Sequence, residues 1–469
     1  MKKITSIISV LLSIIIMVSL FILNMIPDKY LLLIGGVLLI INIISIFLVH
    51  RKNIILRIFG YLFLLIICIG SVVGIYYVGN TTKLFNNLNE VKEKSIYYIV
   101  VNKNSNYKGL KDLNDKKIGT IKSDSTNYKK ALKDIEKNIK ISNKDYNNML
   151  TMFNDVLDNK IDCLLISSNN YDIACENNDN IKNNTKIIYE VSIEVIKEKE
   201  KEYKNSKGTM NILISGIDTN GDINNVSRSD VNIIITVNPN THEVLLTNIP
   251  RDMEVQLHNT TGKTDKLTHA GIYGVDMTRK TLEDFLETDI EYYVRVNFDS
   301  VVEIVDKIGG VDIYNDTSFS TGKYYFKEGE IHLNGAQALA YSRDRYHQSS
   351  GDWSRGIHQM EVIKGIINKV SHSTDLLTNY GDIVESLSRF VQTNIPDTTI
   401  KKYVKNQLND MPSWNTYTYA VAGNGYSYQE TYSMPGINLY VGHKDETSRV
   451  YASKLINGML NGKTKESIS

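Results

Sequence analysis

A short segment between residues 341 and 359 gathers side chains that suit an anionic ligand, namely Arg343, Arg345, Asp352, Arg355 and Gln359. Arg343 and Arg345 are two positions apart, so on an extended segment both guanidinium groups leave the same face and can hold one phosphate. The other three follow at helical spacing and form one stripe. We therefore expect a phosphate-binding segment; the alternative is a solvated, salt-bridged helix start.

A helix must hold that stripe in place. Apolar residues recur at helical spacing behind it, at Ile357, Met360, Ile363, Ile367 and Val370. This periodicity predicts an amphipathic helix that begins near residue 351 and packs its apolar face against the protein.

A second set of charged residues lies at the ends of three β-rich segments, which cover residues 211–217, 231–237 and 244–249. If these strands run up, down and up, Asp218, Arg228, Asp230 and Arg251 meet at one edge of the sheet. Two carboxylates repel each other unless a cation or an arginine lies between them, and a Mg²⁺ ion bound to a phosphate ligand fits this pattern. The alternative is a surface cluster of salt bridges.

Other candidate groups are weaker. Lys266 and His269 lie in one short segment, and a lone histidine is more often structural than catalytic. Cys163 and Cys175 follow the membrane segments; their spacing matches no zinc site and leaves a disulfide between them open. Nothing resembles a serine or cysteine nucleophile with its base.

Three uncharged segments are long enough to cross a bilayer, at residues 4–23, 30–49 and 58–79. Basic residues precede the first and separate the second from the third, so the positive-inside rule places the N-terminus in the cytoplasm and everything after residue 79 outside. A cleaved signal peptide is the alternative for the first segment, but it lacks a small-residue cleavage site. A net charge of +1 over 469 residues gives no indication of a nucleic-acid partner.

The predicted organisation has three parts: three transmembrane helices in residues 1–80, an accessory α/β domain in 81–207 and a larger α/β domain in 208–469. The accessory segment resembles one lobe of an extracellular solute-binding protein. It is too short to contain both lobes, so a structural or partner-docking role is favoured over ligand sensing. A charged linker at residues 195–209 ends it.

Residues 210–460 resemble the LytR-CpsA-Psr family of bacterial cell-wall enzymes. The resemblance rests on an ordered set of motifs: GID ending at Asp218, RSD at 228–230, PRD at 250–252, KLTHAG at 266–271, IGGVDI at 308–313, LNGAQALAYSRDR at 333–345 and GDWSRGIHQ at 351–359. The three spans and the accessory domain are similar to capsule-type members of that family.

The resemblance implies an α/β/α domain with a central mixed sheet and an apolar pocket for a polyprenyl tail. It also implies transfer of a phosphoglycan, teichoic-acid-like or capsular, from a polyprenyl-pyrophosphate carrier to peptidoglycan, with Mg²⁺ or Mn²⁺. Asp218 and Asp230 would hold the metal, and Asp352 and Gln359 match positions of the same pocket. The residues implied to surround the pyrophosphate are Arg228, Arg251, Arg343, Arg345 and Arg355.

One position departs from the family pattern. His358 stands where members usually have arginine, and because it lies off the stripe we expect it to alter the rim of the site. The expected protein is a multi-pass plasma-membrane protein with both α/β domains extracellular, and its accessory domain could contact other wall-assembly proteins. Two further hypotheses are a regulator that binds polymer or lipid without turnover and a hydrolase of the same pyrophosphate.

Overall fold

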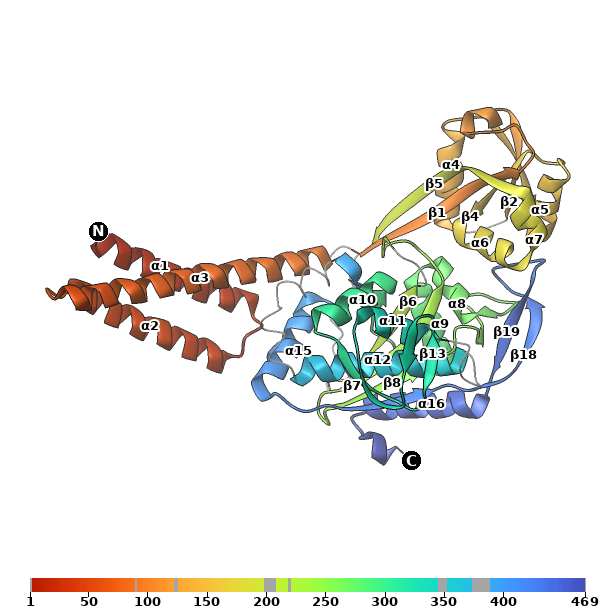
Figure 1. Ribbon diagram of the computed structural model, residues 1–469. Coiled ribbons are helices and arrows are strands. Elements are labelled where there is room, and N and C mark those ends of the chain that lie inside the picture. The colour runs from red at the N-terminus through yellow and green to blue at the C-terminus, as the bar shows by residue number, and fades with distance from the viewer. Residues whose placement is uncertain are drawn as a thin grey trace.

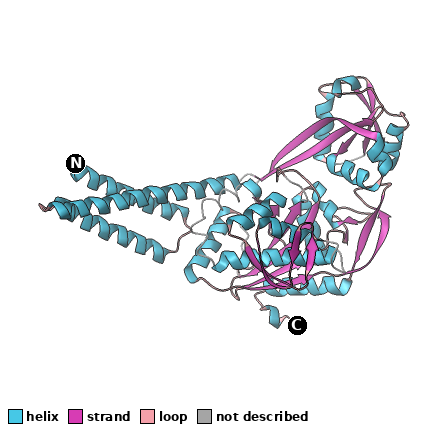
Figure 2. Ribbon diagram, viewed as in Figure 1, coloured by secondary structure: helices cyan, strands magenta, loops and turns pink. Residues whose placement is uncertain are grey.

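The computed structural model describes residues 2–88, 91–121, 125–197, 208–217, 221–344, 352–372 and 389–468. It has an arm of long helices at one end and two α/β parts at the other (Figure 1). Figure 2 shows that the arm consists of helices joined by short turns, whereas strands occur only in the two other parts.

The helical arm consists of α1 (Lys2–Leu23), α2 (Asp28–His50) and α3 (Ile54–Leu88). All three are long and apolar enough to cross a membrane, as predicted. Serine and asparagine side chains join α1 to α2: Ser9 donates to Asn42 at 2.8 Å, and Asn42 donates to Ser13 at 2.9 Å. Such bonds satisfy polar groups that lipid would leave without partners. Helix α3 continues across the predicted boundary at residue 80.

The smaller α/β part contains a five-stranded sheet in the order β3-β2-β4-β1-β5. The strands are β1 (Val91–Asn102), β2 (Lys116–Ile121), β3 (Ile141–Tyr146), β4 (Cys163–Ser167) and β5 (Thr185–Lys197). The helices are η1 (Leu110–Leu113), α4 (Thr126–Glu136), α5 (Met149–Leu157), α6 (Ser168–Asn177) and α7 (Asp179–Asn184). Residues 163–166 of β4 are apolar and buried, as expected for a strand whose sheet has helices on both faces. Cys163 and Cys175 are not bonded to each other.

The larger part is built on a six-stranded sheet in the order β16-β11-β6-β7-β8-β17. Its strands are β6 (Met210–Ile217), β7 (Ser229–Asn238), β8 (Glu243–Asn248), β11 (Tyr292–Val296), β16 (Gln392–Thr393) and β17 (Asn415–Ala420). The sheet is mixed: β6, β7 and β8 are antiparallel neighbours, whereas β11 runs parallel to β6 and β17 parallel to β8.

Helices cover both faces of this sheet, which confirms the predicted α/β/α fold. One face packs against α9 (Val275–Leu286) and α16 (Glu446–Leu460) through Leu282, Leu455 and their neighbours. The other face packs against α12 (Asp352–His372), whose Ile357, Met360, Ile363 and Ile367 meet the sheet. The apolar stripe predicted for this helix is therefore correct apart from Val370, which is exposed.

The remaining helices and strands of the larger part lie outside its six-stranded sheet. They are β9 (Glu254–Val255), β10 (Asp265–Lys266), α8 (Leu267–Ala270), η2 (Gly271–Tyr273), α10 (Phe298–Lys307), β12 (Val311–Asn315), β13 (Phe319–Thr321), β14 (Tyr324–Phe326), β15 (Gly329–Leu333), α11 (Gly335–Arg343), α15 (Asp397–Asp410), β18 (Gly423–Glu430), β19 (Asn438–Lys444) and η3 (Lys465–Ser467).

The accessory part is fixed to the larger part through a shared core. Met434, Ile437 and Leu439, from the β18–β19 hairpin, are buried in the same cluster as α5 and α6. The backbone N–H of Met149 donates to the carbonyl of Pro435 at 2.8 Å. Burial of apolar side chains from both parts in one cluster favours a single rigid arrangement over two independent bodies. The predicted boundary at residue 207 falls outside the described residues.

Candidate anion-binding site

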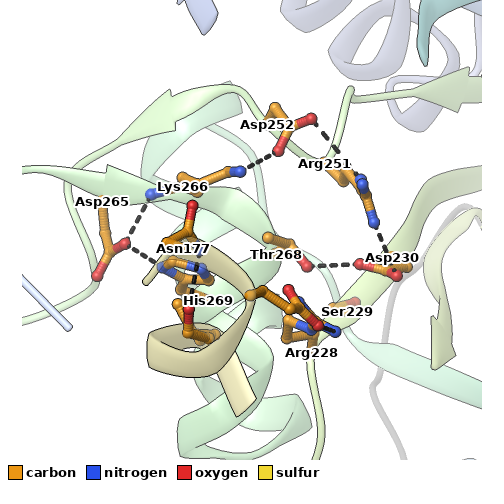
Figure 3. Close-up of polar contacts among 12 residues, drawn as sticks. Asn177, Arg228, Ser229, Asp230, Arg251, Asp252, Asp265, Lys266, Thr268 and His269 are labelled. Carbon is orange, nitrogen blue, oxygen red and sulfur yellow. Dashed lines mark hydrogen bonds and ion pairs between the residues drawn. The ribbon is translucent and has the colours of Figure 1, made fainter. Parts of the chain in front are cut away.

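The candidate site lies where three antiparallel strands have their ends at one edge of the larger sheet. Strand β6 ends opposite the start of β7, with Ile217 paired to Ser229, and the end of β8 pairs with the same half of β7. This up-down-up order is the one the sequence predicted. It brings Arg228, Asp230 and Arg251 together, as Figure 3 shows.

Asp230 is the centre of this group. Its carboxylate is buried, and each oxygen accepts a bond: Arg251 Nη1 donates to Oδ2 at 2.9 Å, and Thr268 Oγ1 donates to Oδ1 at 2.7 Å (Figure 3). Burial alone would raise the pKa of Asp230, but Arg251, the Thr268 hydroxyl, Arg228 and Arg355 outweigh it and lower the pKa below its ordinary value. The carboxylate is therefore ionised at neutral pH.

Two glycines allow this cluster to close. A Cβ on Gly271, the last residue of the KLTHAG motif, would lie 2.5 Å from the backbone nitrogen of Ser229, so only glycine lets this segment press against β7. A Cβ on Gly356 would lie 2.1 Å from Asn248 Nδ2 at the end of β8. This close approach of α12 places the buried Arg355 at the site, where Nη2 donates to the Asp230 carbonyl at 3.4 Å.

Arg228 is held by the accessory part. Glu176, on α6, accepts from both terminal nitrogens of Arg228, at 2.6 Å from Nη1 and 2.9 Å from Nη2. Burial lowers the pKa of Arg228, but the hydrogen bonds to Glu176 and the charge of Asp230 more than offset it, so the pKa is raised. Two parallel bonds of this kind are how an arginine grips a phosphate, so Glu176 occupies the face of Arg228 that a phosphate ligand would use.

A second layer of ion pairs extends from Arg251. Arg251 Nε lies 3.7 Å from Asp252 Oδ2, and Asp252 Oδ1 lies 2.5 Å from Lys266 Nζ (Figure 3). His269 Nδ1 is 2.6 Å from Asp265 and both side chains are buried, which fits the structural role expected for this histidine. Burial raises the pKa of Asp265, but His269 and Ser433 lower it overall.

The structure describes the 341–359 segment at residues 341–344 and 352–359. Arg343 is the last residue of helix α11, and Asp344 after it is extended. Because Arg345 lies outside the described residues, the predicted placement of the two guanidinium groups on one face stays a prediction. The guanidinium of Arg343 is exposed and lies 4.1 Å from the centre of the Phe298 ring. Gln359, further along α12, donates to the Ser342 carbonyl at 3.4 Å and so links α12 to α11.

His358 does not lie at the rim of the site as expected. It is buried in an aromatic cluster, parallel to Phe319 with ring centres 5.1 Å apart and 4.3 Å from the ring of Tyr341. Its Nδ1 lies 3.2 Å from the Tyr341 carbonyl, and burial lowers its pKa. The residue therefore packs the core behind the site, because its position on α12 faces β13 and α11 rather than the strand ends.

The positions of three predicted site side chains lie outside what the structure describes. Asp218 and Arg345 lie outside the described residues, and Asp352 begins α12 with its side chain not described. Within the described ranges, no group of three or more histidine, cysteine or acidic side chains could hold a metal ion. The metal and phosphate-binding roles assigned to these residues remain predictions.

Two contributors were not singled out from the sequence. Thr268 lies inside the KLTHAG motif, so the motif itself was a signal for it. Glu176 carried no signal, because the contact between the accessory part and Arg228 depends on how two domains dock.

We expect that Glu176→Gln will tighten the binding of inorganic pyrophosphate severalfold, because the amide no longer competes with the anion for Arg228. Isothermal titration of the full chain in detergent measures this. Asp179→Asn, which removes the same charge from the neighbouring helix α7, should leave the affinity unchanged. Weaker or unaltered pyrophosphate binding by Glu176→Gln would show that this carboxylate does not compete for the site.

The chain is similar in sequence to a known protein family and to several of its members. The sequence model of the LytR_cpsA_psr family matches residues 164–450. The polyisoprenyl-teichoic acid–peptidoglycan teichoic acid transferase TagU of Bacillus cereus is 36% identical over 234 residues, which cover 48% of this chain and 75% of the relative. TagU of Bacillus subtilis is 38% identical over 207 residues, or 44% of this chain and 66% of the relative.

Solved structures of similar proteins include B. subtilis TagV, with 29% identity, a TM-score of 0.44, and coverage of 55% of this chain and all of that one. TagT bound to LI-WTA has 25% identity and a TM-score of 0.44, with 56% of this chain and 94% of that chain covered. The family match spans more than half of the chain, from β4 of the accessory part to the start of α16. The chain belongs to the LytR_cpsA_psr family.

Proposed function

We propose that this protein transfers a phosphoglycan of the teichoic-acid type from a polyprenyl-pyrophosphate carrier to peptidoglycan. The observation that carries the proposal is the convergence of Arg228, Arg251 and Arg355 on the buried Asp230 at the strand ends. It is supported by relatives that are named teichoic acid transferases.

The chemistry of such a transfer suits a cluster of guanidinium groups. A hydroxyl of peptidoglycan attacks the phosphorus that carries the glycan, the bond to the second phosphate breaks, and polyprenyl phosphate leaves. Negative charge grows on the phosphate oxygens during this step, and fixed arginines stabilise it without forming a covalent intermediate. The buried Asp230 contributes by holding Arg251 in one orientation.

A divalent cation fits the proposal. We assign Mg²⁺, or Mn²⁺ in its place, to Asp230 together with Asp218. Asp230 is ionised, and each of its oxygens accepts one hydrogen bond, so a lone pair remains on each for a hard cation. When bound, the ion would neutralise charge on the phosphate oxygens.

The proposed reaction takes place on the outer face of the membrane. Asp28, the first residue of α2, lies 2.9 Å from Lys405 of α15, so the turn between α1 and α2 is on the same side as the larger part. The turn after α2 lies at the opposite end of the helices (Figure 1). This alternation agrees with the positive-inside argument, which places the basic turn in the cytoplasm. A role of the accessory part in contacting other wall-assembly proteins remains a proposal.

We expect that the full chain in lipid nanodiscs, given Mg²⁺ and a polyprenyl-pyrophosphate glycan, will attach glycan phosphate to peptidoglycan fragments and release polyprenyl phosphate. Mass spectrometry of both products measures the transfer. Tight binding of the lipid without turnover would favour the regulator hypothesis instead. Release of free glycan phosphate, with no dependence on peptidoglycan, would identify a hydrolase.

Asp230→Asn should lower turnover by about a hundredfold, because it removes the charge that orients Arg251 and attracts the cation, while the amide can still accept from Thr268. Asp252→Asn serves as the matched control, since Asp252 is 3.7 Å from the same arginine without touching Asp230. We expect that control to retain most of the turnover. Equal turnover in Asp230→Asn and the wild type at saturating Mg²⁺ would remove Asp230 from the mechanism.

The same variant has an expected effect on stability. The pKa of Asp230 is lowered by folding, so its ionised form stabilises the protein above its ordinary pKa near 3.9, and this contribution is lost as the pH falls through the lower folded value. Asp230→Asn should therefore reduce the melting temperature more at pH 7 than at acidic pH, as thermal unfolding at both values can show.

A further inference from the structure

The outward face of the β18–β19 hairpin carries three tyrosines that form one surface, which we call the tyrosine face. Tyr428 and Tyr440 are directly opposite each other across the two strands, and Tyr426 lies two positions from Tyr428 on the same side. Ring centres are 5.1 Å apart for Tyr426 and Tyr440 and 5.9 Å apart for Tyr428 and Tyr440. The three side chains are 63%, 68% and 40% exposed in the order Tyr426, Tyr428, Tyr440.

The opposite face of the hairpin is fixed to the protein. Leu439 and Val441 alternate with Tyr440 along β19 and are buried. From β18, Gln429 Nε2 donates to Glu254 at 3.0 Å. The tyrosine face is therefore a rigid platform, and contiguous aromatic area held exposed on a rigid platform indicates a binding surface.

This platform is continuous with the candidate site. The backbone N–H of Gly442, on β19, donates to the carbonyl of Asp252 at 2.8 Å. Lys266 Nζ lies 5.9 Å from the centre of the Tyr440 ring and 2.5 Å from Asp252, the residue that follows Arg251. Lys266 and Asp252 therefore link the tyrosine face to Arg251 by direct contacts.

We propose that the tyrosine face binds the glycan strand of peptidoglycan and presents it as the acceptor; the identity of this ligand rests on the proposed function. The C–H faces of pyranose rings stack on exposed aromatic rings, and the tyrosine hydroxyls can bond to sugar hydroxyl and N-acetyl groups. A strand of successive sugars matches several rings along one hairpin better than a single small molecule would.

The charges around the platform favour this glycan over the anionic polymer of the donor. Nearby lysines are already paired with carboxylates: Lys266 with Asp252 and Lys263 with Glu430. Such neutralised pairs offer little attraction to a polyanion. A bilayer is also a poor occupant, because β18 and β19 lie at the end of the molecule opposite α1, α2 and α3 (Figure 1).

The test measures glycan binding by the full chain in nanodiscs without any donor lipid. The probe is a soluble peptidoglycan glycan strand from which the stem peptides have been removed. We expect Tyr428→Ala and Tyr440→Ala each to weaken binding about five- to tenfold, as loss of one aromatic contact does, and Tyr428→Phe to bind nearly as well as the wild type because it keeps the ring.

Tyr325→Ala is the matched control, since Tyr325 is 67% exposed on the separate β13–β14 hairpin. It should leave glycan affinity unchanged, and every variant should bind polyprenyl pyrophosphate like the wild type. In the transfer assay the two alanine variants should raise the Michaelis constant for the acceptor and not for the donor. Circular dichroism confirms that the variants remain folded.

Unchanged glycan affinity in the Tyr428→Ala, Tyr440→Ala double variant would overturn the inference, as would an equal loss in Tyr325→Ala. The inference would also be overturned if the alanine variants kept their affinity for glycan but lost binding to glycan-free lipid vesicles or lost self-association. Either result would identify a different occupant of the tyrosine face. Because binding is measured without turnover, a failure to transfer glycan would count against the proposed function while leaving this inference standing.

Discussion

Burial of the Asp230 carboxylate is the constraint on which the site depends. A carboxylate removed from water must be paired, and leaving one without its partner costs about 3–5 kcal/mol. Arg251, which follows β8, and Thr268, in the KLTHAG motif, both donate hydrogen bonds to this carboxylate on β7. The three segments therefore have to lie together at this edge of the sheet. The positive charges that result are fixed in place before any ligand arrives, which is what stabilisation of a developing phosphate charge needs.

The accessory part packs directly against the site and is not merely tethered to the larger part. Its α6 supplies Glu176 to Arg228, and its core encloses Met434 and Leu439 of the β18–β19 hairpin. The same hairpin carries the tyrosine face on its other side. Docking of the accessory part therefore affects both proposed binding sites. It pairs Glu176 with Arg228, an arginine proposed to bind phosphate, and it supports the tyrosine face, which is proposed to bind the acceptor.

Much of this organisation follows from local sequence patterns. The three spans, the up-down-up strands and the apolar stripe of α12 rest on hydrophobic periodicity, which is set by neighbours in the chain and is therefore readable. The charged residues at the strand ends could be assigned to one edge because antiparallel order leaves a single geometry for them. The motif order then linked these residues to the family to which the chain belongs.

The errors arose where long-range packing decides the outcome. His358 was placed at the rim by its angle on the helix, but the aromatic rings of Phe319 and Tyr341 come from elsewhere in the chain and bury it. Glu176 is far from Arg228 in sequence, and its role depends on domain docking. The hairpin at residues 423–444 was not predicted, and the exposure of its tyrosines on one face depends on how the hairpin packs against the rest of the protein.

The proposed binding of a diphosphate at these strand ends depends on the planar fork of Arg251. The most direct measurement is the affinity of polyprenyl pyrophosphate for Arg251→Lys in nanodiscs, which keeps the charge but removes the fork that reaches Asp230 and a phosphate together. We expect binding to be at least about tenfold weaker than in the wild type. Unchanged affinity in a folded variant would contradict it, because a point charge would then be sufficient.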